Sequence, residues 1–246
     1  NHTGKFDNFL EQVQTQGQLK SPLLAQDGVE IAQYAFNNSP VYDDLAMLNR
    51  WLETRKKSAG SRVALFYNTV SLHDGNHFPG TDAAPNTLQT YKVRLVRFLD
   101  EMEKFMQELD DSGRRAVVVM VPEHGAAVRG DKRQIPGLRE IPTPAITLVP
   151  VGIKVLGGHV QRAGDSVSVD QPTSYLAIAH IVSRMLEKSP FTNNSFASSD
   201  YVVNLPVTQF VAQTDKTTVA GYNQRYYLTD GSNGWEDYAE FNQPAP

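Results

Sequence analysis

The chain has 246 residues, of which 40% are hydrophobic and 20% charged, so it can bury a substantial core and is not a disordered sequence. Its formal net charge of −4 argues against a nucleic-acid partner, because phosphate backbones are bound by basic surfaces. It has no cysteine, so any metal must be held by oxygen and nitrogen ligands of this chain or by ligands elsewhere.

The apolar runs of the chain and its first residues bear on whether it spans a membrane and whether it is part of a longer protein. No stretch approaches the roughly 18 to 20 consecutive apolar residues that a membrane-spanning helix needs. The sequence begins at Asn1 rather than Met, and its first residues resemble neither a signal peptide nor a tag. We interpret this as an internal starting point in a longer protein.

The first part of the chain predicts helices followed by a strand. Residues 5–16 carry apolar side chains at helical spacing and predict a first helix. Residues 43–58 predict a second helix, which begins at aspartates that can act as caps. Residues 62–70 are rich in β-branched and aromatic side chains, which is typical of a buried strand. This strand should lead into the polar loop 71–80.

The clearest helix is predicted at residues 86–110, where apolar side chains recur every three or four positions. The continuous apolar run 116–121 predicts a strand that is covered on both faces. A further apolar run at 145–151 predicts another strand, and the apolar stripe over 175–186 predicts another helix. This alternation predicts an α/β fold with a mostly parallel sheet flanked by helices.

The composition changes at about residue 190, where Asn, Ser, Thr and Tyr become frequent and apolar residues alternate over short stretches. This pattern predicts a C-terminal tail with a small strand or hairpin content. We expect the tail to pack back on the same core.

Polar side chains gather after two of the predicted strands. In open α/β sheets, ligands bind beyond the carboxyl ends of the strands. The end of 62–70 is followed by His73, Asp74 and His77. The end of 116–121 is followed by Glu123 and His124, and then by a loop that carries Arg139.

Glu123 and His124 are the sharpest chemical signal. A carboxylate oxygen and an imidazole nitrogen suit zinc, and a catalytic zinc site needs at least one further ligand and an open position for substrate. Adjacent residues at a strand end, where the chain turns at Gly125, can both reach one ion. The alternative is a capped loop, in which Glu123 binds backbone amides and His124 is a satisfied surface imidazole.

Each of the other candidate site residues has both a chemical and a purely structural interpretation. Gly75 and Pro79 disfavour a helix around His73 and His77, so these histidines need not share a face. Either could be a general acid or base, because an unperturbed imidazole titrates near neutral pH, or simply a hydrogen-bonded loop histidine. A guanidinium at Arg139 can hold a phosphoryl group by two parallel hydrogen bonds, although an exposed arginine without a role is the commoner case.

Two segments together resemble a known family. The sequence Val121-Pro122-Glu123-His124-Gly125, followed by Pro142-Thr143-Pro144-Ala145-Ile146-Thr147-Leu148, resembles the acidic residue-His-Gly region of the alkaline-phosphatase superfamily. That superfamily includes sulfatases, phosphoglycerol transferases and lipid A phosphoethanolamine transferases. The loop 68–79 resembles its substrate-facing histidine loop. Glu123 in place of the usual Asp, and Arg139 in place of the usual His, are similar to the branch that transfers phosphoethanolamine to cellulose in bacterial cellulose secretion systems.

The resemblance implies an alkaline-phosphatase-like fold, with residues 1–190 as the C-terminal part of the catalytic domain and residues 191–246 as an extension packed on it. It implies Zn2+ bound by Glu123 and His124, with His77 and Arg139 facing the transferred phosphoryl group. A serine nucleophile and a cysteine would lie upstream of this chain.

The same resemblance implies a cellular location and binding partners for the protein. The domain would face the periplasm and be anchored in the inner membrane by the missing N-terminal part. The donor would be phosphatidylethanolamine, the acceptor cellulose, and the partner the cellulose synthase and secretion complex. The transfer would pass through a seryl-phosphoethanolamine intermediate.

Two alternatives remain open. A phosphodiesterase or sulfatase-like hydrolase of the same superfamily would use water as the acceptor. A non-catalytic module that docks polysaccharide would use the aromatic residues of the tail, which are Tyr201, Phe210, Tyr222, Tyr226, Tyr227 and Trp235. Aromatic faces stack on sugars, but the same residues at strand-like spacing also suit buried packing.

Overall fold

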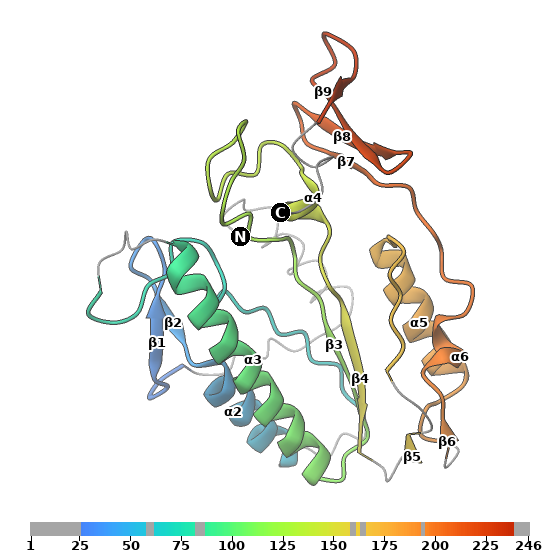
Figure 1. Ribbon diagram of the computed structural model, residues 1–246. Helices are drawn as coiled ribbons and strands as arrows, with labels where there is room; N and C mark the ends of the chain where they lie inside the picture. Colours follow the sequence, from blue (N-terminus) through green and yellow to red (C-terminus); the bar gives the residue numbers. More distant parts are fainter. Residues whose placement is uncertain are drawn as a thin grey trace.

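The computed structural model describes residues 26–57, 62–81, 87–157, 161–162, 166–192 and 195–238 (Figure 1). The helix predicted at 5–16 lies outside the described residues. The first elements are β1 (Ile31–Tyr34), β2 (Pro40–Tyr42), α2 (Asp44–Lys56), α3 (Thr87–Asp111), β3 (Ala116–Met120), α4 (Pro144–Thr147) and β4 (Gly152–Leu156). They are followed by β5 (Gln161–Arg162), α5 (Tyr175–Glu187), β6 (Ser195–Phe196), α6 (Ser199–Val202), β7 (Val211–Gln213), β8 (Thr218–Tyr222), β9 (Arg225–Thr229) and β10 (Glu236–Asp237).

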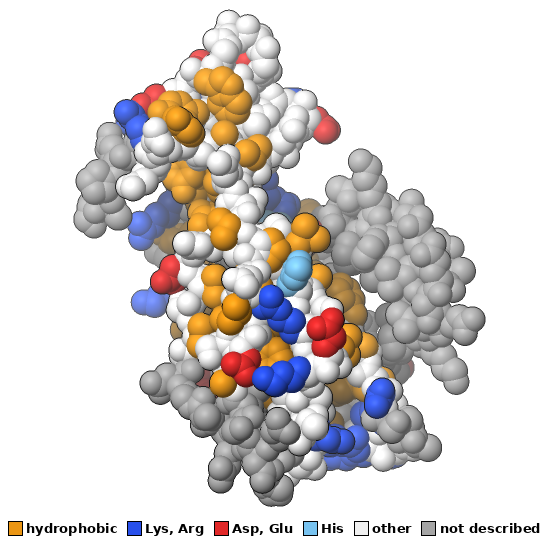
Figure 2. Space-filling view, turned by 90° about the vertical axis from the view of Figure 1, so that its right-hand side faces the viewer, with side chains coloured by type: hydrophobic (Ala, Val, Ile, Leu, Met, Phe, Trp, Pro, Cys, Tyr) orange, Lys and Arg blue, Asp and Glu red, His pale blue; other side chains and the backbone are white. Residues whose placement is uncertain are grey.

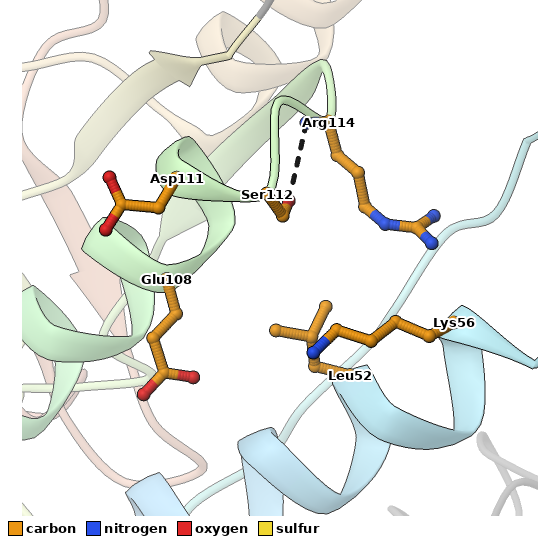
Figure 3. A pocket seen from close by; sticks show the side chains of 6 residues that line it. All are labelled: Leu52, Lys56, Glu108, Asp111, Ser112 and Arg114. Atoms are coloured by element: carbon orange, nitrogen blue, oxygen red, sulfur yellow. Dashed lines mark hydrogen bonds between the residues drawn. The ribbon is translucent and has the colours of Figure 1, made fainter.

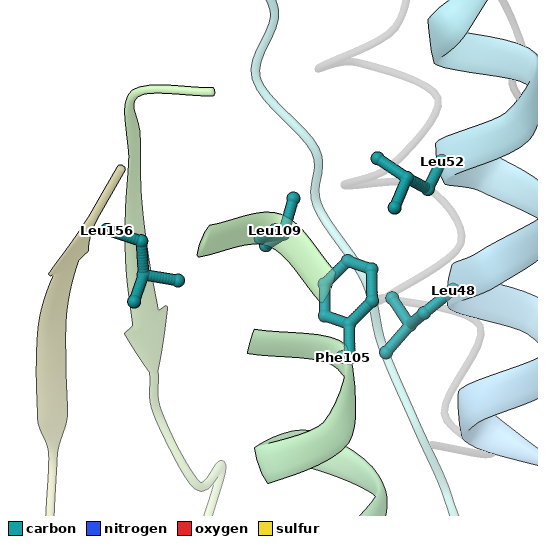
Figure 4. Packing of buried hydrophobic residues seen from close by; sticks show 5 residues of the cluster. All are labelled: Leu48, Leu52, Phe105, Leu109 and Leu156. Carbon is teal, nitrogen blue, oxygen red and sulfur yellow. The ribbon is translucent and has the colours of Figure 1, made fainter. Parts of the chain in front are cut away.

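The core is layered around the β3–β4 ladder, with α2 and α3 on one side and α5 and α6 on the other (Figure 1). Neighbouring residues of β4 serve the two sides because successive side chains of a strand point to opposite faces. Leu156 joins Leu48, Leu52, Phe105 and Leu109 in one buried cluster (Figure 4). Val155 packs with Met185 and Tyr201 on the opposite side. The chain is therefore a mixed α/β structure.

The helices predicted at 43–58, 86–110 and 175–186 are confirmed as α2, α3 and α5, and the strand predicted at 116–121 is confirmed as β3. Capping side chains fix the starts of α2 and α5. Asp43 caps α2 by accepting a hydrogen bond of 2.8 Å from the Ala46 amide, and Ser174 caps α5 in the same way. Arg97 of α3 then bridges Asp43 and Glu101, each at 2.6 Å, which joins the two helices.

The prediction of a strand at 62–70 was wrong. The segment runs close to β3 in Figure 1, but it belongs to none of the described sheets and forms no ladder. Side-chain hydrogen bonds hold it instead, since the Tyr67 hydroxyl donates to the buried Asp44 at 2.5 Å and Thr69 donates to the same carboxylate at 3.0 Å. Val63 and Phe66 of the same segment are 60% and 67% exposed. Apolar composition alone does not make a strand without a partner.

The prediction of a strand at 145–151 was also wrong. Residues 144–147 form the short helix α4, and the ladder strand begins only at Gly152. The reason is local. Pro144 occupies the first helical position, where its fixed φ suits a helix and its missing N–H costs nothing.

The pairing of the described strands differs from the predicted mostly parallel sheet. β3 and β4 are antiparallel, from Ala116 opposite Leu156 to Met120 opposite Gly152, and only the two-residue pair β5–β6 is parallel. A parallel connection needs a returning segment of a dozen or more residues, usually a helix. Residues 121–151 are long enough for such a connection, but their only described helix is the four-residue α4, and β4 lies antiparallel beside β3.

The tail has the strand content that its sequence predicts. Strands β7 to β10 form an antiparallel sheet in the order β10-β9-β8-β7. Val219, Leu228 and Tyr238 are its buried centre, and Ile141 of the loop before α4 packs against them. The hydroxyls of Thr214 and Thr217 also donate to the main-chain oxygen of Glu140, at 3.1 and 2.8 Å. The tail sheet therefore holds the loop that carries Arg139.

The outer surface of the described chain is mixed in character. On the face shown in Figure 2, apolar side chains are interspersed with charged ones. α5 contributes Leu176 and Leu186, which are 67% and 81% exposed. Within the described part of the chain, no helix combines the length and the apolar character that crossing a membrane requires.

Phe105→Ala tests the cluster drawn in Figure 4. Removing a buried aromatic ring that lies beside Leu48 and belongs to the same cluster as Leu156 should lower the free energy of unfolding by about 3–5 kcal/mol. Leu186→Ala, at an exposed helical position, should change it by less than about 0.5 kcal/mol. Urea unfolding followed by circular dichroism measures both. A loss of under about 1 kcal/mol for Phe105→Ala would show that this cluster is not the core.

Candidate functional site

The end of β3 is docked against α4 by a glycine. The Gly125 amide donates to the Ile146 main-chain oxygen at 2.7 Å, and a Cβ atom at Gly125 would collide with the Ala145 main-chain oxygen. Only glycine allows the two backbones to approach this closely. The turn therefore fixes the direction in which the two preceding residues, Glu123 and His124, leave the strand.

His124 is held in one orientation by its own turn. Its Nδ1 lies 2.9 Å from the Gly125 main-chain oxygen, and because a carbonyl only accepts, Nδ1 must carry the proton. In the neutral ring, Nε2 then presents a lone pair. Histidines that bind metals are usually oriented in this way, with the second nitrogen donating to a carbonyl or carboxylate. In the described structure, the Arg139 guanidinium donates to Nε2.

Glu123 lies beside His124 with an exposed side chain. The Tyr175 hydroxyl, at the start of α5, donates to the main-chain oxygens of Pro122 and Glu123, at 2.8 and 3.3 Å. Partial burial, and then the negative charge of Glu123, raise the pKa of Tyr175. The carboxylate of Glu123 therefore lies within electrostatic reach of this phenol.

Sequence reasoning assigned Tyr175 only to the apolar stripe of α5 and missed its contact with the strand end. A polar signal was present, because a phenol carries a hydroxyl that usually finds a partner when it is packed against protein. The pattern could not indicate which main-chain oxygens would accept its hydrogen bond, since these lie more than fifty positions earlier in the chain.

The loop that carries Arg139 is braced by polar side chains. The buried Gln134 side chain makes two hydrogen bonds of 3.0 Å with the main chain of Ile141. Asp131 accepts hydrogen bonds from the Arg133 and Gln134 amides and from the Tyr238 hydroxyl of the tail. These bonds fix the loop on both sides of Arg139, whose own side chain is exposed and reaches His124.

The histidine loop, here residues 71–77, is in contact with the loop before α4 that carries Arg139, which we call the arginine loop. A Cβ atom at Gly137 would collide with the carboxylate of Asp74, so the two loops are in close contact there. His73, next to Asp74, stacks on Phe36 with 6.0 Å between the ring centres. Of the predicted site residues, Glu123, His124 and Arg139 thus lie together, and Asp74 brings the histidine loop to the side of Arg139.

His77 lies in a more enclosed place than the other candidates. Its main chain pairs with Tyr34 through hydrogen bonds of 2.8 and 2.9 Å, and its side chain is only 5% exposed. Nδ1 of its ring has no hydrogen-bond partner among the described residues. No contact described in the structure joins this ring to Glu123, His124 or Arg139. His180 is exposed on α5, and His159 lies outside the described residues.

The side chains at this site could supply part of the coordination shell of a zinc ion. The described residues contain no group of three or more His, Asp or Glu side chains that could hold a metal ion. Glu123 and His124 offer one carboxylate and one imidazole, whereas zinc takes about four ligands, of which about three come from protein in a catalytic site. These two side chains match zinc in type and require further ligands.

Two hollows of the described surface lie away from the predicted site residues. One of about 440 Å³ opens between the C-terminal ends of α2 and α3 (Figure 3). It is lined by Leu52, Lys56, Glu108, Asp111, Ser112 and Arg114, and contains none of the predicted site residues. The candidate site is instead a polar surface formed by the end of β3 and two loops.

Comparison with known proteins identifies the family. Residues 1–235 match the family model described as "Cellulose biosynthesis protein BcsG C-terminal domain". The cellulose biosynthesis protein BcsG of Escherichia coli K12 is 41% identical over 239 residues, which are 97% of this chain and 42% of that protein. The BcsG protein of Salmonella typhimurium LT2 is 42% identical over the same shares.

The chain spans less than half the length of these relatives, and the alignment covers nearly all of it. The identities lie well above the level at which a shared family is in doubt. The chain therefore belongs to the family of the BcsG C-terminal domain.

Proposed function

We propose that this chain acts in cellulose biosynthesis, as the names of its relatives state for those proteins, and that it is part of a zinc-dependent phosphoethanolamine transferase. The observation that carries the proposal is the grouping of Arg139, His124 and Glu123 at the end of β3. A guanidinium beside a carboxylate–imidazole pair suits a phosphoester that is held by both an arginine and a metal ion.

Glu123 and His124 would hold the zinc ion, with the remaining ligands contributed from outside this chain. When bound, zinc would supply a Lewis acid that lowers the pKa of a coordinated hydroxyl. The hydrogen bond between His124 Nδ1 and the Gly125 oxygen orients the imidazole for this purpose, and Tyr175 steadies the main chain of the same turn. Two of the features that a metal ligand needs, the right tautomer and a fixed ring, are thus present.

Arg139 would stabilise negative charge on the non-bridging oxygens of the phosphoryl group. A guanidinium has five N–H donors in a fixed fork, so it can bind two phosphoryl oxygens at once. Phosphoryl transfer is largely a matter of positioning and electrostatic stabilisation. The bracing of the loop by Gln134 and by the tail sheet serves this role, because a donor that is already in place needs no reorganisation.

The transfer would run in two displacements. A serine of the preceding polypeptide, already deprotonated, would form a bond to phosphorus while the bond to the diacylglycerol oxygen of phosphatidylethanolamine breaks, and a protonated His77 would deliver its proton to that oxygen. A glucose hydroxyl of cellulose would then give its proton to His77 and form the new bond to phosphorus, while the bond from phosphorus to the serine oxygen breaks and the deprotonated serine is restored. The role of His77 rests on the family resemblance, and its enclosed ring has an Nδ1 atom without a hydrogen-bond partner among the described residues.

The proposal includes a location. This chain would lie in the periplasm and be anchored to the inner membrane by the polypeptide that precedes it, next to the cellulose synthase and secretion complex. The donor lipid and the emerging polysaccharide would meet there.

A polysaccharide-docking role for the tail has support from two exposed rings. Tyr222 and Trp235 are 67% and 56% exposed, whereas Phe210 and Tyr226 pack edge to face at 5.2 Å and Tyr201 is buried. Exposed aromatic faces can stack on sugar rings. Such a surface would hold the acceptor near the Arg139 loop, which the same sheet supports.

Arg139→Ala in the full-length protein should lower transfer by about 10²–10³-fold, because one charge-stabilising donor is lost. The assay follows phosphoethanolamine release from phosphatidylethanolamine vesicles with and without cello-oligosaccharide, which also separates a transferase from a hydrolase. Arg133→Ala, on the same loop but paired with Glu236 at 2.9 Å, serves as the control and should keep the parent rate. An unchanged rate for Arg139→Ala would disprove its role.

Glu123→Gln and His124→Asn should each weaken zinc binding by at least about 10–100-fold in the full-length protein, since losing a ligand costs at least as much as losing a residue that orients one. Elemental analysis after dialysis measures the bound zinc. His180→Asn, on the exposed side of α5, removes a histidine outside the site and should leave the zinc content unchanged. Full zinc occupancy in both site variants would contradict the metal assignment.

A further inference from the structure

Arg94 is the most unusual charged side chain of the described structure. It is 1% exposed, although arginine is almost never fully buried unless it is paired. Nη1 donates to the main-chain oxygens of Ser71 and His73, at 2.9 and 3.0 Å, and the guanidinium lies 5.7 Å from the centre of the Tyr91 ring. Nε and Nη2 have no hydrogen-bond partner among the described residues.

The stability of the fold does not account for this arginine. Burial lowers the pKa of Arg94, and the Asp74 carboxylate only partly offsets the effect. Replacing a buried charged group by an apolar side chain of similar volume is often neutral or stabilising. A buried arginine is therefore better explained by the conformation that it imposes on its partners.

The partners of Arg94 are the main chain of the histidine loop, residues 71–77. By holding the Ser71 and His73 carbonyls, Arg94 fixes the loop on both sides of Leu72. Asn76 adds a hydrogen bond of 2.7 Å from its side chain to the Val70 main-chain oxygen. Gly75 has φ of +77°, and a Cβ atom there would collide with Phe36. The loop is thus held in one shape, with Asp74 projecting from it.

Asp74 makes the contact between the histidine loop and the arginine loop. Gly137 has φ of +81°, and the space that its side chain would take is filled by the Asp74 carboxylate. Arg139 follows two positions later and reaches His124. A shift of the histidine loop would therefore remove the surface against which the start of the Arg139 segment is packed.

We propose that Arg94 and Asp74 are positioning residues, which set the place of Arg139 at the end of β3 through the contact between Asp74 and Gly137. The proposal rests on the role proposed above for Arg139. Neither residue needs to touch the substrate. Their effect is to reduce the range of positions available to a guanidinium whose own side chain is exposed.

Three variants of the full-length protein test this. Arg94→Met keeps the volume but loses both hydrogen bonds to the loop, and should lower kcat for phosphoethanolamine transfer by about 10²-fold, as a displacement near 1 Å can. Asp74→Ala should lower kcat at least about tenfold. Because Asp74 is exposed, this variant should fold, and it tests the inference even if Arg94→Met does not fold. Arg97→Met is the matched control, since Arg97 lies on the same helix but pairs with Asp43 and Glu101; its kcat should stay at the parent value.

Double variants with Arg139→Ala distinguish positioning from a general loss of stability. If Arg94 and Asp74 act through Arg139, then Arg94→Met and Asp74→Ala should lower kcat by less than about twofold once Arg139 is already alanine. A multiplicative loss in that background, or an unchanged kcat of both single variants, would overturn the inference and leave the proposed function intact. An unchanged rate for Arg139→Ala alone would instead remove the proposed function, and this inference with it.

Discussion

The site depends on the close approach of two backbones at Gly125. Because no side chain fits between this residue and the main chain of α4, the end of β3 must turn there, and Glu123 and His124 leave the strand in a fixed direction. The same turn supplies the carbonyl that holds the His124 ring. A single steric constraint thus places the main chain of both proposed zinc ligands, and the turn also orients the His124 ring.

Around this turn, functional side chains come from surface loops that buried polar groups hold in place. Gln134 and the tail sheet brace the loop of Arg139, and Arg94 braces the loop of Asp74. Exposed loops of this kind would otherwise be mobile, since they bury little apolar surface. The C-terminal sheet therefore has a part in the site that its sequence position does not indicate, because it stabilises a loop seventy or more residues earlier in the chain.

Local patterns were enough to predict α2, α3, α5 and β3, because caps, apolar periodicity and a continuous apolar run are properties of neighbouring residues. The Glu-His pair after β3 was visible for the same reason. The sequence could not reveal that 62–70 lacks a ladder partner or that β4 returns antiparallel, since pairing is settled by distant segments. The start of α4 at Pro144 was a local signal that the apolar run 145–151 masked. The contacts of Tyr175 and Arg94 with main-chain oxygens were hidden because any residue can provide a carbonyl.

The central claim is that Glu123 and His124 share one zinc ion. Crystals of the full-length protein, measured on both sides of the zinc absorption edge, give an anomalous difference map that locates zinc directly. Our account predicts a peak about 2.0–2.2 Å from His124 Nε2 and from a Glu123 carboxylate oxygen, with Arg139 turned away from Nε2. A zinc peak bound entirely by other residues, with Arg139 still on His124, would contradict it.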